Sequence, residues 1–171
     1  MKSKLFNIKM ILMDVDGVLT SGEIIYSSSG EELKNFNSQD GLGIRLARMG
    51  GLITGIITGR ESEMVRRRAG ELKIDIISQG NFDKLKPYEE IKNQHGLSDE
   101  EIAFIGDDIP DICIMKRVGF SAAVSNARDE VKAISDYVTI AAGGYGAVRE
   151  VIEKILKRQG KFFDIIEEIS Q

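Results

Sequence analysis

Residues 8–17 read IKMILMDVDG, a nearly continuous apolar run that ends in two aspartates and a glycine. An apolar run of this length is typical of a strand that is buried on both faces, as the central strands of a parallel sheet are. Asp14 and Asp16 come directly after it, where the strand should reach the edge of the sheet. We therefore expect two carboxylates at the carboxyl end of a buried strand.

Five further apolar runs of strand length alternate with amphipathic stretches of helix length. The runs are residues 52–57, 74–77, 102–105, 122–124 and 137–140, and the expected helices are 41–49, 62–72, 86–95, 110–118 and about 147–158. Ser98–Glu101 has the pattern of a helix cap, but a strand follows too soon, so we expect a turn there. This alternation predicts an α/β fold, a doubly wound, Rossmann-like parallel sheet with helices on both faces.

One segment after the first strand interrupts this alternation. Residues 23–27 and 32–37 flank Ser28-Ser29-Gly30, which predicts a β-hairpin over about residues 22–37. A lone two-stranded hairpin is barely stable in water, and an exposed apolar patch usually marks an interface. We expect the hairpin to pack on other subunits through exposed apolar side chains, namely Ile24, Ile25, Tyr26, Leu33 and Phe36.

Composition narrows the class of protein. The 171 residues contain 42% hydrophobic and 29% charged residues and show no repeat or linker, so we expect one domain over residues 1–171. The net charge of −4 argues against nucleic acid as a partner. A single cysteine, Cys113, and the lack of a membrane span or signal peptide favour a cytoplasmic protein.

The polar residues that follow the apolar runs are the candidate site residues, because ligands of such sheets bind beyond the carboxyl ends of the strands. Four groups fall there: Asp14-x-Asp16-Gly17, Thr58-Gly59-Arg60, Lys84, and Gly106-Asp107-Asp108-x-x-Asp111. In this order they resemble the four motifs of the haloacid dehalogenase superfamily of phosphotransferases, and the resemblance spans nearly the whole chain.

The resemblance implies a phosphatase that forms an aspartyl-phosphate on Asp14. A carboxylate nucleophile divides ester hydrolysis into two easier steps. Asp16 would protonate the leaving alkoxide and later activate water. Thr58 and Lys84 would hold the phosphoryl oxygens, where charge must be stabilised. Lys86 is the alternative catalytic lysine, but it abuts Pro87 at a helix start, so we favour Lys84.

A cation is needed to screen the repulsion between Asp14 and a phosphate dianion. Mg²⁺ prefers oxygen ligands from a few carboxylates, water and phosphate. The carboxylates of Asp14 and Asp107 would supply them, with the backbone carbonyl of Asp16 between them. Asp108 and Asp111 are better placed to orient the waters of the metal than to bind it directly.

Most relatives carry a cap domain, for which this chain has no room. The finer pattern is similar to the family of 3-deoxy-D-manno-octulosonate 8-phosphate phosphatases: Phe36-Asn37-x-x-Asp40-Gly41, Gln79-Gly80, and Gly143-Gly144-x-Gly146-Ala147-Val148-Arg149-Glu150. This resemblance implies a role in lipopolysaccharide precursor synthesis and a homotetramer formed through the hairpins. It is shared with domains of some sialic-acid cytidylyltransferases, so another sugar-acid phosphate is an alternative substrate.

A sugar-acid phosphate also suits several further residues as substrate ligands, besides Asp16 and Lys84. Arg60 and Arg68 could bind its carboxylate, because a guanidinium matches carboxylate geometry; Arg68 could instead belong to a solvated charged helix face. A polar loop could reach across the cleft, formed by Asn37, Ser38, Gln39, Asp40 and Gly41. Asp40 could equally be a helix cap, and the glycines at 143–146 either a flap or a turn.

Two other classes of protein stay open. A receiver domain also combines a doubly wound sheet with aspartates and magnesium, but its acceptor aspartate follows the third strand, where this chain has Ser78-Gln79-Gly80. A catalytically silent oligomerisation domain would not need the four motifs, which are intact here.

Overall fold

The computed structural model describes residues 4–171, and a six-stranded parallel sheet forms its centre. The strands are β1 (Met10–Met13), β4 (Ile53–Ile57), β5 (Ile76–Ser78), β6 (Ile102–Gly106), β7 (Phe120–Ala123) and β8 (Tyr137–Val138). Their order in the sheet is β5-β4-β1-β6-β7-β8, so the chain winds outward from β1 in both directions. The predicted doubly wound parallel sheet is confirmed.

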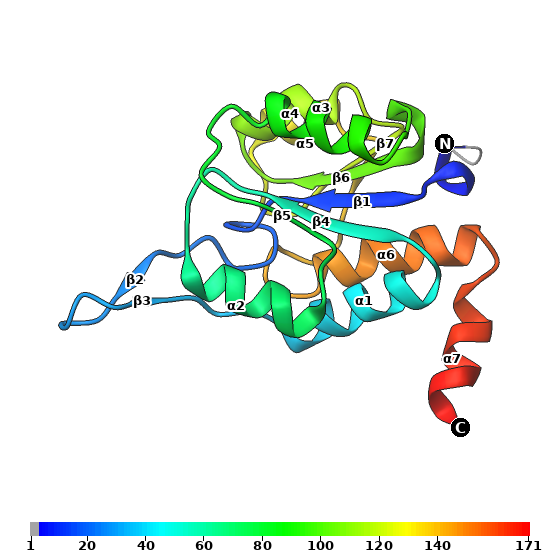
Figure 1. Cartoon of the computed structure of the whole chain (residues 1–171), viewed down its shortest axis with the longest axis horizontal. Coiled ribbons are helices and arrows are strands. Elements are labelled where there is room, and N and C mark those ends of the chain that lie inside the picture. Colours follow the sequence, from blue (N-terminus) through cyan, green and yellow to red (C-terminus); the bar gives the residue numbers. More distant parts are fainter. Residues whose placement is uncertain (1–3) are drawn as a thin grey trace.

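Helices cover both faces of the sheet (Figure 1). They are α1 (Ser38–Met49), α2 (Glu63–Leu72), α3 (Leu85–Gln94), α4 (Ile112–Met115), α5 (Asp129–Ile134), α6 (Ala147–Arg158) and α7 (Phe162–Ser170). The helices α3, α4 and α5 lie on one face, and α1, α2 and α6 on the other, where α1 packs along α6. Within residues 4–171, no helix has the length and apolarity needed to cross a membrane.

Burial explains why the central strands read as unbroken apolar runs. All four residues of β1 are fully buried, because β4 and β6 pair with its edges and helices cover both its faces. β6 is buried along its whole length, including Phe104, which is 0% exposed. Removing each such side chain from water stabilises the fold by about 1.5–3 kcal/mol. The site therefore rests on the most buried part of the sheet.

Three helical segments differ from the predictions. The single helix expected over 110–118 is wrong: a 3-10 turn (Ile109–Asp111) precedes the short α4, because Asp108 and Asp111 cap each other there. α5 and α7 were not predicted at all. The expected turn at Ser98–Glu101 is confirmed as a capped 3-10 turn over Asp99–Glu101.

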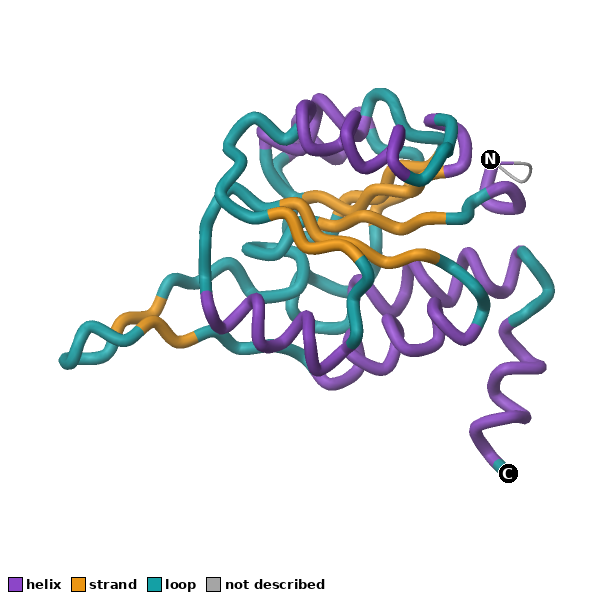
Figure 2. The backbone as a smooth tube through the Cα atoms, viewed as in Figure 1, coloured by secondary structure: helices purple, strands orange, loops and turns teal. Residues whose placement is uncertain are grey.

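The hairpin consists of β2 (Ile25–Tyr26) and β3 (Glu32–Leu33), paired antiparallel, and projects from the body (Figure 2). Its apolar side chains Ile24, Ile25, Tyr26 and Leu33 are 43–63% exposed. The expectation that Phe36 is also exposed is wrong. Phe36 is partly buried against the core, because the chain has already returned to the body to begin α1.

Asp40 connects α1 to the start of α6. Its carboxylate is 1% exposed and accepts hydrogen bonds from the backbone N–H of Gly146 at 3.1 Å and of Arg149 at 3.0 Å. Backbone N–H groups in the first turn of a helix have no partner within the helix, so a buried carboxylate there satisfies them. Asp40 is thus a helix cap, although of α6 rather than of its own helix.

We expect Asp40→Ala to lower the free energy of unfolding by about 1–3 kcal/mol, because it leaves buried N–H groups unpaired. Urea unfolding measures this. Asp129→Ala is the matched control, since the Asp129 side chain is 99% exposed and should change stability by less than about 0.5 kcal/mol. Equal losses in both variants would contradict the capping role.

Candidate active site

The carboxyl ends of β1, β4 and β6 open into one cavity of about 210 Å³. Its lining holds eight of the residues that the sequence singled out, Asp14, Asp16, Thr58, Arg60, Lys84, Asp107, Asp108 and Asp111, together with Gly59, Phe82 and Pro110. The four motifs, which extend from Asp14 to Asp111 in the sequence, therefore meet at one edge of the sheet, as expected for a parallel sheet.

Lys84 lies between two carboxylates at the centre of this cavity. Its Nζ is 2.9 Å from Oδ1 of Asp14 and donates a hydrogen bond to Oδ1 of Asp111 at 2.7 Å. All three side chains are at most 10% exposed. Lys86, the alternative lysine, is exposed on α3. The geometry favours Lys84 as the lysine that acts beside Asp14.

The pKa values of Asp14 and Lys84 are both raised. Burial, followed by the nearby Asp111 carboxylate, raises the pKa of Asp14 to about 6, although Lys84 partly offsets both effects. Burial alone would lower the pKa of Lys84, but Asp14 and Asp111 outweigh it and raise that pKa. At neutral pH the lysine is thus a cation and most of Asp14 is a carboxylate.

The turn after β1 depends on glycine at position 17. Gly17 has a φ of +98°, and a Cβ there would lie 2.1 Å from Oδ2 of Asp107. A side chain would therefore be strained and would collide with the neighbouring carboxylate. Gly143 also packs closely against this turn: a Cβ added at Gly143 would lie 1.6 Å from the carbonyl oxygen of Gly17.

The glycine-rich segment 143–146 is a packed turn that leads into α6. The N–H of Gly144 donates to the carbonyl of Val18 at 2.9 Å, and that of Gly143 to the side chain of Asn126 at 2.9 Å. Of the two alternatives for this segment, the structure has the turn. This segment packs against the turn that follows β1, at Gly17 and Val18.

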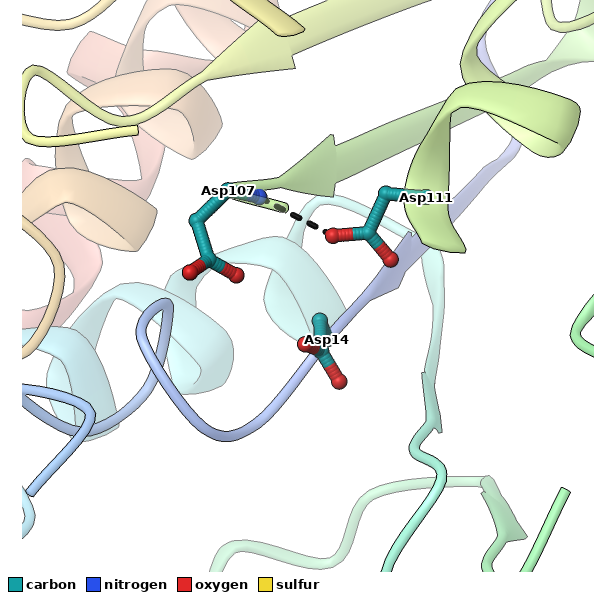
Figure 3. Close-up of side chains that lie close together, drawn as sticks. All are labelled: Asp14, Asp107 and Asp111. Carbon is teal, nitrogen blue, oxygen red and sulfur yellow. Dashed lines mark hydrogen bonds between the residues drawn. The ribbon is translucent and has the colours of Figure 1, made fainter. Parts of the chain in front are cut away.

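Asp14, Asp107 and Asp111 converge on one point, with a carboxylate oxygen from each lying within 4.8 Å of the others (Figure 3). Oδ1 of Asp107 is buried and accepts no hydrogen bond from the described residues. Oxygen ligands with an unused lone pair, close together and negatively charged, fit a hard divalent cation such as Mg²⁺. The residues present therefore suit the metal that the sequence predicted.

Asp111 belongs to this cluster, but its oxygens already have partners. Oδ1 accepts from Lys84, and Oδ2 accepts from the backbone N–H of Asp107 at 2.9 Å and of Asp108 at 3.3 Å. Asp111 is thus placed to orient Asp107 and Lys84 rather than to bind a metal itself. Asp108 is exposed and caps the 3-10 turn by accepting from the N–H of Ile109 at 2.7 Å.

Besides Arg60, the surroundings of Asp16 include two side chains that the sequence did not single out, Lys34 and Glu32. Lys34, from the segment directly after β3, donates a hydrogen bond to Oδ1 of Asp16, and Nε of Arg60 is 3.8 Å from Oδ2. Glu32 lies 3.6 Å from Lys34 and accepts from Arg60 at 2.9 Å. Glu32 and Lys34 alternate along a strand and so share a face, which was the only signal of this cluster in the sequence.

The predicted substrate ligands fall into two separate groups. Arg60 lines the catalytic cavity, whereas Ser38, Gly41 and Arg68 line a groove between α1 and α2. Arg68 pairs there with Glu71 at 3.1 Å. Within one chain, the structure does not bring this second group to Asp14.

Members of the 37–41 loop also have structural roles. Asn37 caps α1 by accepting from the N–H of Gln39 at 2.7 Å, and it donates to the carbonyl of Gly144 at 3.2 Å. The side chain of Asp40 caps α6, so only the backbone of Asp40 could contact a ligand. Ser38 and Gln39 are exposed. Substrate binding by this loop stays a prediction.

Comparisons with known proteins agree with this geometry. The model of the haloacid dehalogenase-like hydrolase family matches residues 67–152. The 3-deoxy-D-manno-octulosonate 8-phosphate phosphatase of Escherichia coli K12 is 42% identical over 159 residues, which are 93% of this chain and 85% of that protein.

Two solved structures of such phosphatases have nearly the same fold. The enzyme from Moraxella catarrhalis, in complex with a magnesium ion, a phosphate ion and a KDO molecule, has a TM-score of 0.96 and 46% identity, covering 98% of this chain and 97% of that one. The cobalt-bound enzyme from Haemophilus influenzae has a TM-score of 0.92 and 38% identity, covering 98% and 99%.

The fold, the carboxylate cluster and these similarities define a haloacid dehalogenase-like hydrolase without a cap domain. Within that superfamily the chain belongs to the family of 3-deoxy-D-manno-octulosonate 8-phosphate phosphatases. It is a phosphoric monoester hydrolase.

Metal binding should release protons. Burial, then the Asp14 and Asp111 carboxylates, raise the pKa of Asp107 to about 8, so without metal this side chain is mostly protonated at pH 7. A cation binds the carboxylate, so Mg²⁺ must displace that proton. We expect Mg²⁺ affinity to rise with pH up to about 8 and then level off, and calorimetry in buffers of different ionisation enthalpy to show proton release at pH 7.

Asp107→Asn should abolish this Mg²⁺ binding, whereas Asp108→Asn, which keeps the cap and alters an exposed group, should retain most of it. In metal-free protein Asp107→Asn should raise the melting temperature at pH 7, because folding then no longer has to protonate a buried carboxyl group whose pKa is raised. An Mg²⁺ affinity that does not change between pH 6 and 8 would contradict the raised pKa of the ligand.

Proposed function

We propose that this chain hydrolyses 3-deoxy-D-manno-octulosonate 8-phosphate to the free sugar acid and phosphate through an aspartyl-phosphate on Asp14. The observation that carries the proposal is the buried Asp14 carboxylate beside Lys84, in a chain 46% identical to an enzyme whose structure contains Mg²⁺, phosphate and KDO. The reaction would serve lipopolysaccharide precursor synthesis in the cytoplasm, as the sequence pattern implies.

In the first step, an oxygen of Asp14 attacks the phosphorus atom and the bond from phosphorus to the sugar oxygen breaks. The departing alkoxide takes a proton from the carboxyl group of Asp16. Lys84 stabilises the charge on the phosphoryl oxygens, and the Thr58 hydroxyl, 2% exposed at the end of β4, donates to one of them. The products of this step are the sugar acid and a phosphorylated Asp14.

In the second step, Asp16, now a carboxylate, takes a proton from water, and the water oxygen attacks the phosphorus atom. The bond from phosphorus to Asp14 breaks, which releases phosphate and restores both aspartates. Asp14, Asp107 and the backbone carbonyl of Asp16 would hold Mg²⁺, whose positive charge would offset the negative charge of the phosphoryl oxygens. Arg60, which lines the cavity and pairs with Glu32, would bind the carboxylate of the sugar acid.

The direct test is phosphate release from 3-deoxy-D-manno-octulosonate 8-phosphate with and without Mg²⁺. We expect turnover with Mg²⁺, loss of activity with a chelator, and a loss of at least about 10³-fold in Asp14→Asn, since the covalent step then has no nucleophile. Asp83→Asn is the control, because Asp83 is exposed and its cap to Leu85 survives the change. Clear preference for a sialic-acid phosphate would replace the substrate but keep the chemistry.

We also propose that the chain forms a homotetramer through its hairpins, and that neighbouring subunits complete each site. Two observations support this. The hairpin leaves Ile25, Tyr26 and Leu33 largely exposed. The catalytic cavity and the groove with Arg68 are separate within one chain, so a facing copy could supply the second group of ligands. A closed symmetric assembly would bury the exposed side chains of the hairpin. It would also bring the groove of one chain to the catalytic cavity of another.

Light scattering should report a tetramer. The double variant Ile25→Glu with Leu33→Glu should dissociate it, because each new carboxylate would lose its water at the interface. The matched control is Ile140→Glu, since Ile140 is 90% exposed but lies outside the hairpin. Dissociated chains should lose selectivity for the sugar acid over an aryl phosphate. Monomers with unchanged selectivity would refute the shared site.

A further inference from the structure

The hairpin contributes a buried lysine directly to the catalytic site. We propose that Lys34 is a positioning residue for the carboxyl group of Asp16. The hairpin would then act in the chemistry as well as in assembly. This proposal rests on the proposed function, because it takes Asp16 to be the acid–base residue.

The surroundings of Lys34 are unusual for a hairpin lysine. Its side chain is only 1% exposed, although residues on either side of it in the hairpin are exposed. A buried ammonium is costly unless it is paired, and Lys34 pairs with Oδ1 of Asp16 and lies 3.6 Å from Glu32. An ordinary surface lysine would extend into water instead.

The stem of the hairpin holds Lys34 in this place. Glu32 accepts from the hydroxyl of Ser62 at 2.7 Å and from Arg60 at 2.9 Å, which ties β3 to the start of α2. Leu33, between Glu32 and Lys34, is 52% exposed on the opposite side. Strand alternation thus turns one face of this short segment to the catalytic cavity and the other outward.

This arrangement divides the two oxygens of Asp16 between two tasks. Oδ1 is fixed by the Lys34 ammonium, while Oδ2 is buried and accepts no hydrogen bond from the described residues. A carboxyl group that must give and take a proton needs one fixed orientation and one free oxygen. The ammonium also stabilises the negative charge that Asp16 acquires once it has protonated the leaving group.

The test is a double-mutant cycle on the intact Mg²⁺-loaded enzyme. It compares kcat/KM for 3-deoxy-D-manno-octulosonate 8-phosphate, whose alkoxide needs protonation, with that for p-nitrophenyl phosphate, whose leaving group does not. We expect Lys34→Met and Lys34→Gln to lose about tenfold or more on the sugar phosphate and less than about threefold on the aryl ester. Lys34→Arg should restore part of the loss.

In an Asp16→Asn background, Lys34→Met should cause no further loss, because its partner is already gone. Lys116→Met is the charge-matched control at an exposed position. Melting temperature and light scattering show whether the variants fold and assemble. If Lys34→Met does not fold, Lys34→Gln serves instead, because it removes the charge but keeps a polar side chain.

Equal losses on both substrates, or the same loss in the Asp16→Asn background as in the wild type, would overturn the role of Lys34. If the wild type prefers a different alkyl phosphate, the substrate proposal fails, and the same cycle on that ester still tests Lys34.

Discussion

The crowding of three carboxyl groups around one largely buried lysine is the constraint on which the rest of this structure depends. Asp14, Asp107 and Asp111 meet at the ends of β1 and β6, and Lys84 forms ion pairs with Asp14 and Asp111. Such a cluster is unfavourable by itself, so the surrounding fold must hold it in place. Its backbone does so with glycines: a Cβ on Gly17 would strike Asp107, and one on Gly106 would lie 2.7 Å from Asp111.

The sequence predicted the parts of the fold and the site that depend on local pattern. β1 and β6 were recognisable because burial on both faces leaves no polar position within the strand. The polar residues just after those strands could be assigned to one edge because parallel strands end together. The helix expected at 110–118 failed, since the caps of Asp108 and Asp111 tighten the backbone into a 3-10 turn. The pattern of apolar spacing does not report such a cap.

Contacts between segments that are far apart in the chain could not be predicted from the sequence. In the sequence, Lys34 looks like an ordinary charged residue of the hairpin, and only the folded chain brings it to Asp16. Arg60 and Arg68 were both predicted to bind the substrate carboxylate, but Arg60 precedes α2 and lines the cavity, whereas Arg68 lies against Gly41. Asp40 was predicted both as a possible ligand and as a cap; its partners are the first N–H groups of α6, more than 100 residues away.

The close packing of Gly143 against Gly17 bears on the order of events in a catalytic cycle. The segment behind the catalytic turn leaves no space between its backbone and the Gly17 carbonyl, and Gly144 closes the same side through Val18. The cavity at the sheet edge, which Asp14 lines, gives a substrate access to this residue. In the proposed mechanism the sugar leaves this cavity before water attacks the aspartyl-phosphate, so phosphate would be the last product to leave and would compete with the substrate for the cavity.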